Sequence, residues 1–425
     1  MNFIRKKICD GVNFSNIKDT RFKTGRISIT VFLPLEKEDA SKNAIVPFLL
    51  SKTCKQYPDL KSLNDRLEDL YGVSVGAEVS KLGETQVLSI SASGVDAEDS
   101  RDEESISVGT ADLLCKMFFE PILENGKFLD KNVEQEKRQL IETIEAEYND
   151  KRIFAKNQCE SWMCKNEKFG INRLGTIEQV EKLTPEEICK AWQNILSSAQ
   201  IEITLLGKAD SKTVFDKFKK EFNKINRTNV VTCSTKIIKR AEKVSEYTDE
   251  MEVSQSKLVM GFRTEVSADD DLVNAMRVAV ALFGVTPHSK LFLNVREKYS
   301  LCYYCAAKYD KNKGIMLVQS GVENQNINKA KEEILNQLEE VKKGKFTEED
   351  VDSIKKSLAN SFRTVGDYLS SMENFYLSQI FDKNKFTTDE LIEKINKVTR
   401  DEIITAANMI TLDTIYVLKG VSGNR

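Results

Sequence analysis

The side chains that most often perform enzyme chemistry are unevenly supplied in this chain of 425 residues, which has one histidine, His288, and nine cysteines. Catalytic zinc is usually held by two or three histidines together with a carboxylate. The single histidine therefore excludes a metallopeptidase that carries a complete HExxH or HxxEH motif of its own. Any triad that depends on histidine would have to use His288, which lies between Pro287 and Ser289 at an expected helix start. A local structural contact is the simpler interpretation of that position.

The cysteines include one pair at the CxxC spacing, Cys302 and Cys305, and a looser pair, Cys159 and Cys164. A single CxxC has no second pair to complete a tetrahedral zinc site. It also lies in an expected strand, without the helix N-terminus that lowers the pKa of a redox thiol. We therefore interpret both pairs as structural, and the odd number of cysteines indicates free thiols in a reducing cytosol.

Charge and hydropathy exclude several further classes of function. The 63 basic and 66 acidic residues are interleaved without a basic face, so nucleic acid is not an expected partner. Glycines occur singly, which gives no phosphate-binding loop, and no serine lies in a GxSxG pattern. The sequence contains no run of 18 apolar residues and no signal-peptide core at its start. These patterns predict a cytoplasmic protein without membrane insertion.

The elements that must position any site are repeated along the chain. Residues 177–191, IEQVEKLTPEEICKA, match residues 392–406, IEKINKVTRDEIITA, without gaps at an offset of 215, with seven identical positions. Each copy contains a capping-box pattern, Thr184 with Glu187 and Thr399 with Glu402, which predicts a helix start. Each copy is followed by an apolar strand that ends in glycine. The chain is therefore expected to be two homologous halves.

Each half combines alternating strands with amphipathic helices. The segment RISITVFL, for example, places Ile27, Ile29, Val31 and Leu33 on one face of a strand. This mixture predicts an α+β fold in which helices pack on one face of a mainly antiparallel sheet. We expect an N-terminal domain at 1–226, a polar linker at 227–250 and a C-terminal domain at 251–425.

The segment 283–323, FGVTPHSKLFLNVREKYSLCYYCAAKYDKNKGIMLVQSGVE, carries a specific pattern, S-x-L-F-x-x-x-R-E-x-x-x-L-x-Y, filled by Ser289, Leu291, Phe292, Arg296, Glu297, Leu301 and Tyr303. The pattern resembles the second-domain signature of the M16 metallopeptidase family, which includes insulinase and the mitochondrial processing peptidase. RFKTGRISITVFLPL, LEDLYG at 67–72 and VEQEKRQLIETI at 133–144 extend the resemblance over essentially the whole chain. It implies two LuxS/metallohydrolase-like domains, and the chain is most similar to small bacterial members that look like inactive subunits.

The resemblance identifies the positions at which active family members hold zinc. Their HxxEH motif lies upstream of a tyrosine- or arginine-proline pair. When the chain is aligned with those members at Tyr57-Pro58, Ala44, Pro47 and Phe48 occupy the positions of His, Glu and His. Alanine and phenylalanine have no lone pair for zinc, and proline cannot act as a general base.

The third zinc ligand of the family is a glutamate in a helix with the form E-x6-E. Counting from Glu136 places Thr143 at the ligand position, with Glu142 one residue away. The resemblance therefore implies that this chain binds no metal and that no catalytic residue acts on its own. Zinc is expected in a partner subunit.

The second half keeps an arginine and a tyrosine, Arg296 and Tyr303, which the resemblance implies hold the substrate at the scissile peptide. A guanidinium group can donate to two carbonyl oxygens of an extended peptide. A phenol can donate to the negative charge that develops on the carbonyl oxygen of a tetrahedral intermediate. Tyr304 stays as an alternative to Tyr303, because neighbouring strand residues face opposite ways.

These expectations combine into one functional hypothesis. The chain would be a non-catalytic subunit of a zinc metalloendopeptidase, forming a heterodimer with an HxxEH-bearing homologue and supplying Arg296 and Tyr303 in trans for cleavage of a peptide. The alternative is a non-enzymatic scaffold or peptide-binding protein with the same fold. Loss of turnover on substituting the pair would favour the first interpretation.

Overall fold

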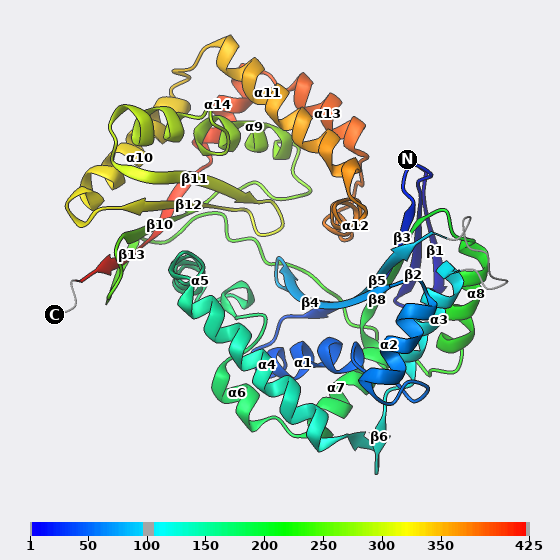
Figure 1. Ribbon diagram of the computed structural model, residues 1–425. Helices are drawn as coiled ribbons and strands as arrows, with labels where there is room; N and C mark the ends of the chain where they lie inside the picture. The colour runs from blue at the N-terminus through cyan, green and yellow to red at the C-terminus, as the bar shows by residue number, and fades with distance from the viewer. Residues whose placement is uncertain (1, 97–105, 422–425) are drawn as a thin grey trace. The chain divides into compact units, whose positions relative to one another are not determined.

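The structure is a computed structural model that describes residues 2–96 and 106–421. The chain divides into two compact units (Figure 1). Unit 1 comprises Met1–Glu145, Ile171–Ser234 and Leu369–Asn374, and unit 2 comprises Ala146–Gly170, Thr235–Tyr368 and Phe375–Arg425. Each unit therefore includes a short segment from the half of the chain that mainly builds the other unit.

Unit 1 is built on a mixed sheet with the strand order β1-β2-β8-β3-β5-β4 in the described chain. Strands β2 and β8 pair in parallel, and the other neighbours pair antiparallel. The strands are β1 (Asn2–Cys9), β2 (Val12–Lys18), β3 (Thr24–Pro34), β4 (Ser74–Leu82), β5 (Thr85–Val95) and β8 (Gln200–Gly207), with a small hairpin of β6 (Leu123–Glu124) and β7 (Lys127–Phe128).

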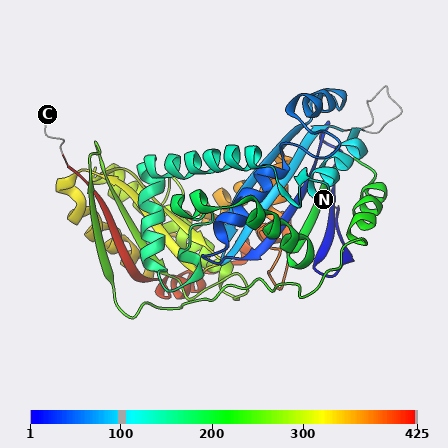
Figure 2. The ribbon, with the colours of Figure 1, turned by 90° about the horizontal axis from the view of Figure 1, so that it is seen from below.

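One face of this sheet is covered by helices. Figures 1 and 2 show α1 and α7 together on that face, where they pack against each other. Helix α7 starts at the predicted capping box, in which the Thr184 hydroxyl accepts from the Glu187 amide. The helices of this part of the chain are α1 (Ala40–Leu50), α2 (Leu60–Asp69), α3 (Ile106–Phe119), α4 (Asp130–Asn149), α6 (Ile177–Lys182), α7 (Pro185–Ser198) and α8 (Ser211–Phe222).

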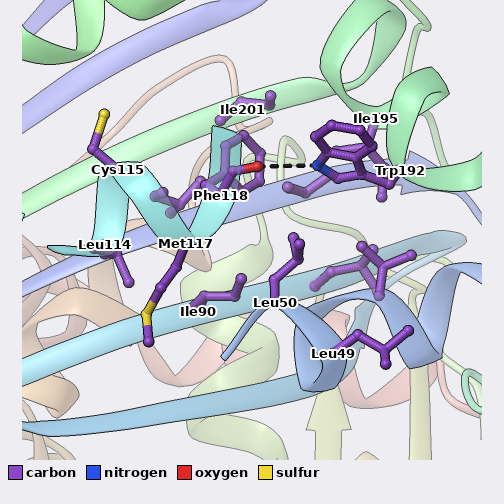
Figure 3. Close-up of a cluster of buried hydrophobic side chains, with 14 of the residues drawn as sticks. Leu49, Leu50, Ile90, Leu114, Cys115, Met117, Phe118, Trp192, Ile195 and Ile201 are labelled. Atoms are coloured by element: carbon purple, nitrogen blue, oxygen red, sulfur yellow. Dashed lines mark hydrogen bonds between the residues drawn. The ribbon is translucent and has the colours of Figure 1, made fainter. Parts of the chain in front are cut away.

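The helix-covered face holds the core of unit 1. The alternating residues of β3 lie in it as predicted: Ile27, Ile29, Val31 and Leu33 are all buried. Figure 3 shows part of this core, where Trp192 donates a hydrogen bond from Nε1 to the Phe118 carbonyl oxygen at 3.0 Å. Because the indole N–H is paired, this large ring is buried without leaving an unsatisfied donor.

The opposite face of β3 is polar and receives a segment from the far end of the chain. Glu373 is buried and accepts from Arg26 Nε at 2.5 Å and from the Ser28 hydroxyl. Both acceptor oxygens of the carboxylate are thus engaged. A buried charge is tolerated when it is paired and hydrogen-bonded in this way.

Unit 2 has a sheet with the order β11-β12-β10-β13-β9 in the described chain. Strands β13 and β9 pair in parallel, and the other neighbours pair antiparallel. The strands are β9 (Ser245–Met251), β10 (Ser256–Arg263), β11 (Cys302–Asp310), β12 (Ile315–Val322) and β13 (Thr411–Gly420).

Helices cover both faces of the unit 2 sheet. One face carries most of them, and α5 lies on the other face against β10 and β13 (Figure 1). The helices of unit 2 are α5 (Lys151–Met163), α9 (Val273–Gly284), α10 (Ile327–Lys342), α11 (Glu348–Arg363), α13 (Thr388–Lys397), α14 (Arg400–Asn408) and the π-helix η3 (Leu291–Lys298), with short 3₁₀ turns η2 (Lys168–Gly170), η4 (Asn324–Asn326) and η5 (Thr364–Asp367). Helix α12 (Leu369–Leu377) is divided, because its residues Leu369–Asn374 belong to unit 1.

Helix α5 packs closely against the sheet, and buried ion pairs between side chains lie at its C-terminal end. Because Gly261 in β10 has no side chain, the Met163 sulfur can approach its backbone: a Cβ there would lie 2.6 Å from Sδ. Just beyond the helix, Glu167 pairs with Arg263 at 2.7 Å and with Lys313 at 2.7 Å. Removing one partner of such a network would leave a buried charge unpaired.

The two sheets confirm the predicted α+β fold of duplicated halves. The order β2-β8-β3-β5-β4 in unit 1 corresponds to β9-β13-β10-β12-β11 in unit 2, and unit 1 adds β1. The second predicted capping box is also present, because the Thr399 hydroxyl accepts from the Glu402 amide at the start of α14.

Neither unit is one continuous stretch of the sequence, in contrast to the expected domains at 1–226 and 251–425. Adding the repeat offset of 215 to the bounds of α5 gives 366–378, the region of α12. Part of α12 belongs to unit 1 while α5 belongs to unit 2, so equivalent helices are exchanged between the halves. In addition, residues 245–250 of the expected linker form strand β9. A helical pattern shows that one face will be buried but not which sheet will bury it.

Within the described part of the chain, no helix is both long and apolar enough to span a membrane.

Candidate functional site

Arg296 lies on η3, which is wound as a π-helix. Two buried residues of this helix, Leu291 and Val295, anchor it in the core of unit 2. The Asn294 side-chain amide donates to Gln337 Oε1 of α10 at 2.6 Å. The Arg296 guanidinium lies over the Phe292 ring, 4.7 Å from its centroid. π-helical turns are rare and recur at functional sites, and here the turn fixes where the arginine emerges.

The connection from η3 to β11 contains a strained residue. Ser300 has a φ of 50°, in the left-handed region that non-glycine residues seldom adopt. The Tyr299 amide donates to the Asn294 carbonyl at 2.9 Å, and the Leu301 amide donates to the Val295 carbonyl at 3.0 Å. These bonds hold the tight turn and bring the start of β11 back beside Arg296.

Strand β11 begins with a β-bulge. Cys302 is opposite Val322 on β12, while Tyr304 is already opposite Gly321. One extra residue, Tyr303, is therefore accommodated between them. Its side chain is 69% exposed. A bulge re-aims side chains, and this one directs Tyr303 away from the core.

Arg296 and Tyr303 line the same cleft in unit 2, with a volume of about 370 Å³. Glu297, Ser300, Leu301 and Cys302 also line it, as do Glu323 and Asn326 beyond the end of β12. The structure thus brings the two residues named from the sequence into one lining. Sequence reasoning did not single out Glu323 or Asn326, whose only signal is that they directly follow a strand.

Tyr304, the alternative to Tyr303, lies elsewhere. Its ring is half-buried beneath the Arg152 guanidinium of α5, whose carbon is 4.6 Å from the ring centroid. Burial raises the pKa of the Tyr304 phenol, and the nearby Arg152 charge opposes this. A Cβ on Gly321 would lie 2.6 Å from Tyr304 Cε1, so the ring crosses directly over that glycine. Tyr304 is a packing residue on the α5 side of the sheet.

The Arg296 guanidinium is available to a ligand. Its side chain is 41% exposed, and its ion pair with the neighbouring Glu297 is long, at 3.6 Å. Such exposed pairs contribute little and exchange easily. An arginine fork and a phenol on one cleft can together donate to carbonyl oxygens of a bound peptide.

The positions that correspond to the family's zinc motif lie in unit 1 and are part of its packing. Ala44 and Pro47 are buried in α1, with Pro47 inside the helix, and Phe48 is half-buried against the core. The surroundings of Pro47 are apolar and include Ile29, Val31, Val46, Leu50, Leu88, Ile90, Phe118 and Ile195. These residues offer no donor to zinc, so the site does not fit the metal.

The third position has no carboxylate. Thr143 is exposed on α4, and its hydroxyl donates to the Gln139 carbonyl at 2.8 Å, a bond within its own helix. No group of three or more His, Cys, Asp or Glu side chains suited to a metal ion occurs within residues 2–96 and 106–421.

Glu136 lies about two helical turns before Thr143 on α4. It is 3% exposed, and its Oε2 atom has no hydrogen-bond partner in the described structure. Burial raises the pKa of this carboxyl, and the Lys52 charge partly opposes the shift. In the sequence analysis Glu136 served only as the residue from which the ligand position was counted. Its burial and the missing hydrogen-bond partner of Oε2 could not be predicted from the sequence.

The remaining sequence candidates lie outside the cleft or at its wall. His288 is exposed, and its backbone amide donates to the Thr286 hydroxyl at 3.3 Å. Cys159 and Cys164 are buried, and neither forms a disulfide in the described structure; burial raises the pKa of Cys159 strongly. Cys302 and Cys305 are buried free thiols as well, and Cys302 forms part of the cleft wall.

The sequence and the fold of this chain are similar to those of proteins related to peptidases. Residues 182–358, which include the η3-β11 segment, match the family model described as "Peptidase M16 inactive domain". The chain is 32% identical over 413 residues to the "Probable inactive metalloprotease YmfF" of Bacillus subtilis strain 168, and the match covers 97% of each chain.

Solved structures agree with the fold. A conserved protein from Enterococcus faecalis V583 superposes with a TM-score of 0.91 at 28% identity and covers 100% of both chains. A peptidase M16 inactive domain from Pseudomonas fluorescens superposes with a TM-score of 0.77 at 13% identity, over 100% of this chain and 99% of that one. The second likeness concerns the fold alone.

Proposed function

The chain belongs to the peptidase M16 family, and from this premise we propose that it is a non-catalytic subunit that supplies Arg296 and Tyr303 to a zinc-bearing, HxxEH-containing relative. The observation that carries the proposal is a contrast within one molecule. Arg296 and Tyr303 line an open cleft in unit 2, whereas Ala44, Pro47 and Phe48 in unit 1 offer no zinc ligand.

In this proposal the two residues act on the peptide and not on the metal. The partner's zinc would supply the activated water. Arg296, exposed and only loosely paired with Glu297, would donate to backbone carbonyl oxygens and hold the peptide extended. The Tyr303 hydroxyl would donate to the carbonyl oxygen on which negative charge develops. Donors fixed in advance at that position stabilise the transition state more than the substrate.

The irregular backbone supports the assignment of Tyr303 over Tyr304. The bulge leaves Tyr303 exposed at the cleft, and Tyr304 is engaged by Arg152 on the other side of the sheet. A single extra residue in β11 therefore distinguishes the two neighbouring phenols. We further propose that the pair of subunits works in the cytoplasm, which is consistent with nine cysteines that form no disulfide in the described structure.

Reconstitution tests the proposal. The full chain is co-expressed with an HxxEH-containing M16 relative from the same cell, the complex is purified, and cleavage of a peptide library is followed. Tyr303→Phe removes one oxyanion donor and is expected to lower kcat by about 10²–10³-fold. Arg296→Ala is expected to lower kcat/KM, because it removes carbonyl contacts made by bound peptide and transition state alike.

Tyr299→Phe is the matched control, because Tyr299 is also exposed on the same segment but is not part of the cleft lining. Unchanged turnover in Tyr303→Phe and Arg296→Ala complexes would refute the proposal. A chain that binds peptides through Arg296 but supports no cleavage in any complex would instead be the non-enzymatic peptide-binding protein.

A further inference from the structure

Cys302 and Cys305 face the same side of β11, although residues three apart in a regular strand face opposite sides. Cys302 is opposite Val322 and Cys305 is opposite Ser320, two residues apart on β12. The bulge at Tyr303 adds one residue between the two cysteines, and this restores the same facing that residues two apart have in a regular strand. Both thiols therefore enter the same core and are 9% and 6% exposed, respectively.

The two thiols interact and differ in acidity. The neighbouring Cys305 thiol lowers the pKa of Cys302; burial opposes this shift, and Ser320 and the Arg296 charge add smaller contributions in the same direction as Cys305. The neighbouring Cys302, together with burial, raises the pKa of Cys305. One sulfur is thus favoured as the thiolate and the other as the thiol. A thiolate near a cation is the nucleophilic form of cysteine.

Of the two cysteines, Cys302 is the one that lines the cleft shared with Arg296 and Tyr303. A small molecule bound in that cleft therefore lies nearer to Cys302 than to Cys305. Cys115 offers a contrast, because it also lines a surface pocket, in unit 1, but burial raises its pKa to about 12. Access alone therefore does not make a thiol of this chain reactive.

We propose that Cys302 and Cys305 form a redox site that a hydroperoxide oxidises to an intramolecular disulfide. The Cys302 thiolate attacks one peroxide oxygen, the O–O bond breaks, and the departing oxygen takes a proton and leaves as water or an alcohol. Cys302 is then a sulfenic acid. The Cys305 thiol attacks that sulfur, the S–S bond forms, and the S–O bond breaks with release of water. The dithiol loses two electrons and the peroxide gains them.

The spacing suits a disulfide. Same-face neighbours in a strand are about 6.6 Å apart at Cα, which lies within the range of about 4.4–6.8 Å that disulfides bridge. A disulfide formed between them can be reduced again by thiol exchange with an added dithiol.

Closure would also move Tyr303, since it is the residue at the top of the bulge. Its effect on peptide cleavage rests on the proposed function, whereas the thiol chemistry does not. The two can be tested apart, because oxidation is measured on the isolated chain without any partner subunit.

The experiment uses the reduced full-length chain. It is treated with stoichiometric hydrogen peroxide, free thiols are blocked with iodoacetamide, and peptides are mapped by mass spectrometry without reduction. The expected product is a peptide with Cys302 joined to Cys305, lighter by two hydrogen atoms and restored by dithiothreitol. In Cys305→Ser the reaction should stop at a Cys302 sulfenic acid that a 1,3-dione traps.

Cys115 in the same sample is the internal control, and Cys302 is expected to be alkylated at least about 10-fold faster at neutral pH because its thiolate fraction is larger. The proposal is overturned if Cys302 reacts no faster than Cys115, or if peroxide gives sulfinic acid or scattered oxidation without the Cys302–Cys305 bond. The wild-type map decides this even if a cysteine variant fails to fold.

Discussion

Residues 40–50 in unit 1 and residues 291–305 in unit 2 are the two segments that the sequence resemblance aligns with the chemistry-bearing segments of active M16 peptidases, and they differ most in backbone regularity. The first is the helix α1, with buried apolar residues at Ala44 and Pro47. The second contains a π-helix, a left-handed Ser300 and a β-bulge within 15 residues. Irregularities of this kind cost about 1–3 kcal/mol each and persist only where surrounding contacts enforce them.

The difference teaches how the two segments are used. In the first segment, Ala44, Pro47 and Phe48 carry no polar side chain, and the surroundings of Pro47 are apolar. A segment that must hold an arginine and a phenol on one cleft needs its unusual turns. In this chain the irregular backbone of unit 2 accompanies the cleft that Arg296 and Tyr303 line.

The largest expected effect comes from restoring a histidine to the first segment. Ala44 has no exposed surface, so Ala44→His should lower the free energy of unfolding by about 3 kcal/mol, through overpacking and a buried imidazole. Chemical denaturation followed by circular dichroism measures this, with and without added zinc. We expect zinc to recover none of the loss, because the other ligand positions are Phe48 and Thr143.

Lys42→His on the same helix is the matched control. The Lys42 side chain is 33% exposed and pairs with Asp39 near the surface, so this change should cost less than about 1 kcal/mol. If Ala44→His and the unmodified chain were equally stable, room for a ligand would remain at this position. That result would contradict the contrast between the buried first segment and the open cleft of the second.

A smaller effect is expected at the bulge. A Cβ on Gly321 would lie 2.6 Å from both Tyr304 Cε1 and Gln255 Oε1. Gly321→Ala should therefore lower the free energy of unfolding by about 2 kcal/mol, because the Tyr304 ring must move. Gly76→Ala in β4 is the control: its nearest neighbour would be Ser91 Oγ at 3.9 Å, so a change within about 0.5 kcal/mol is expected. Similar losses at both glycines would show that the bulge is not specially packed.

The smallest effect concerns Glu136, a buried carboxyl group of unit 1. Its pKa is raised by burial above the ordinary value of 4.5. Between 4.5 and the raised pKa the folded chain holds this proton more tightly than the unfolded chain, so this carboxyl makes stability fall as pH rises. Glu136→Gln removes that loss and should raise the free energy of unfolding near neutral pH by about 1 kcal/mol or less.

The pH profile separates this cause from a general packing change. The advantage of Glu136→Gln should be absent near pH 4, grow above 4.5 and then level off, whereas Glu142→Gln, at an exposed position of the same helix, should show none. An advantage that did not depend on pH would contradict the assignment of a buried, unpaired carboxyl.

Much of the fold could be predicted from the sequence because its signals are local. The capping boxes at Thr184 and Thr399 mark helix starts through contacts three residues apart. The alternation of Ile27, Ile29 and Val31 shows which face of β3 is buried. The internal repeat then predicts the duplication that the two strand orders confirm.

The candidate site was only partly predictable. Arg296 and Tyr303 could be named from their spacing, but strict alternation along β11 could not distinguish Tyr303 from Tyr304. Residues three apart in a regular strand face opposite sides, whereas the bulge puts Cys302 and Cys305 on the same face. A bulge depends on pairing with β12, 15 or more residues away, so no local pattern reveals it.

The sequence by itself determined which chemistry this chain can hold: one histidine, no ligand at Ala44, Pro47 or Phe48, and a guanidinium and a phenol seven residues apart. Side-chain types and periodicity are properties of the chain alone. The tertiary structure decided which way those groups face and which sheet each helix covers, as the exchange of α5 and residues 369–374 shows. These outcomes depend on packing between distant segments, where burying a face or adding a residue to a strand changes the energy of the whole unit.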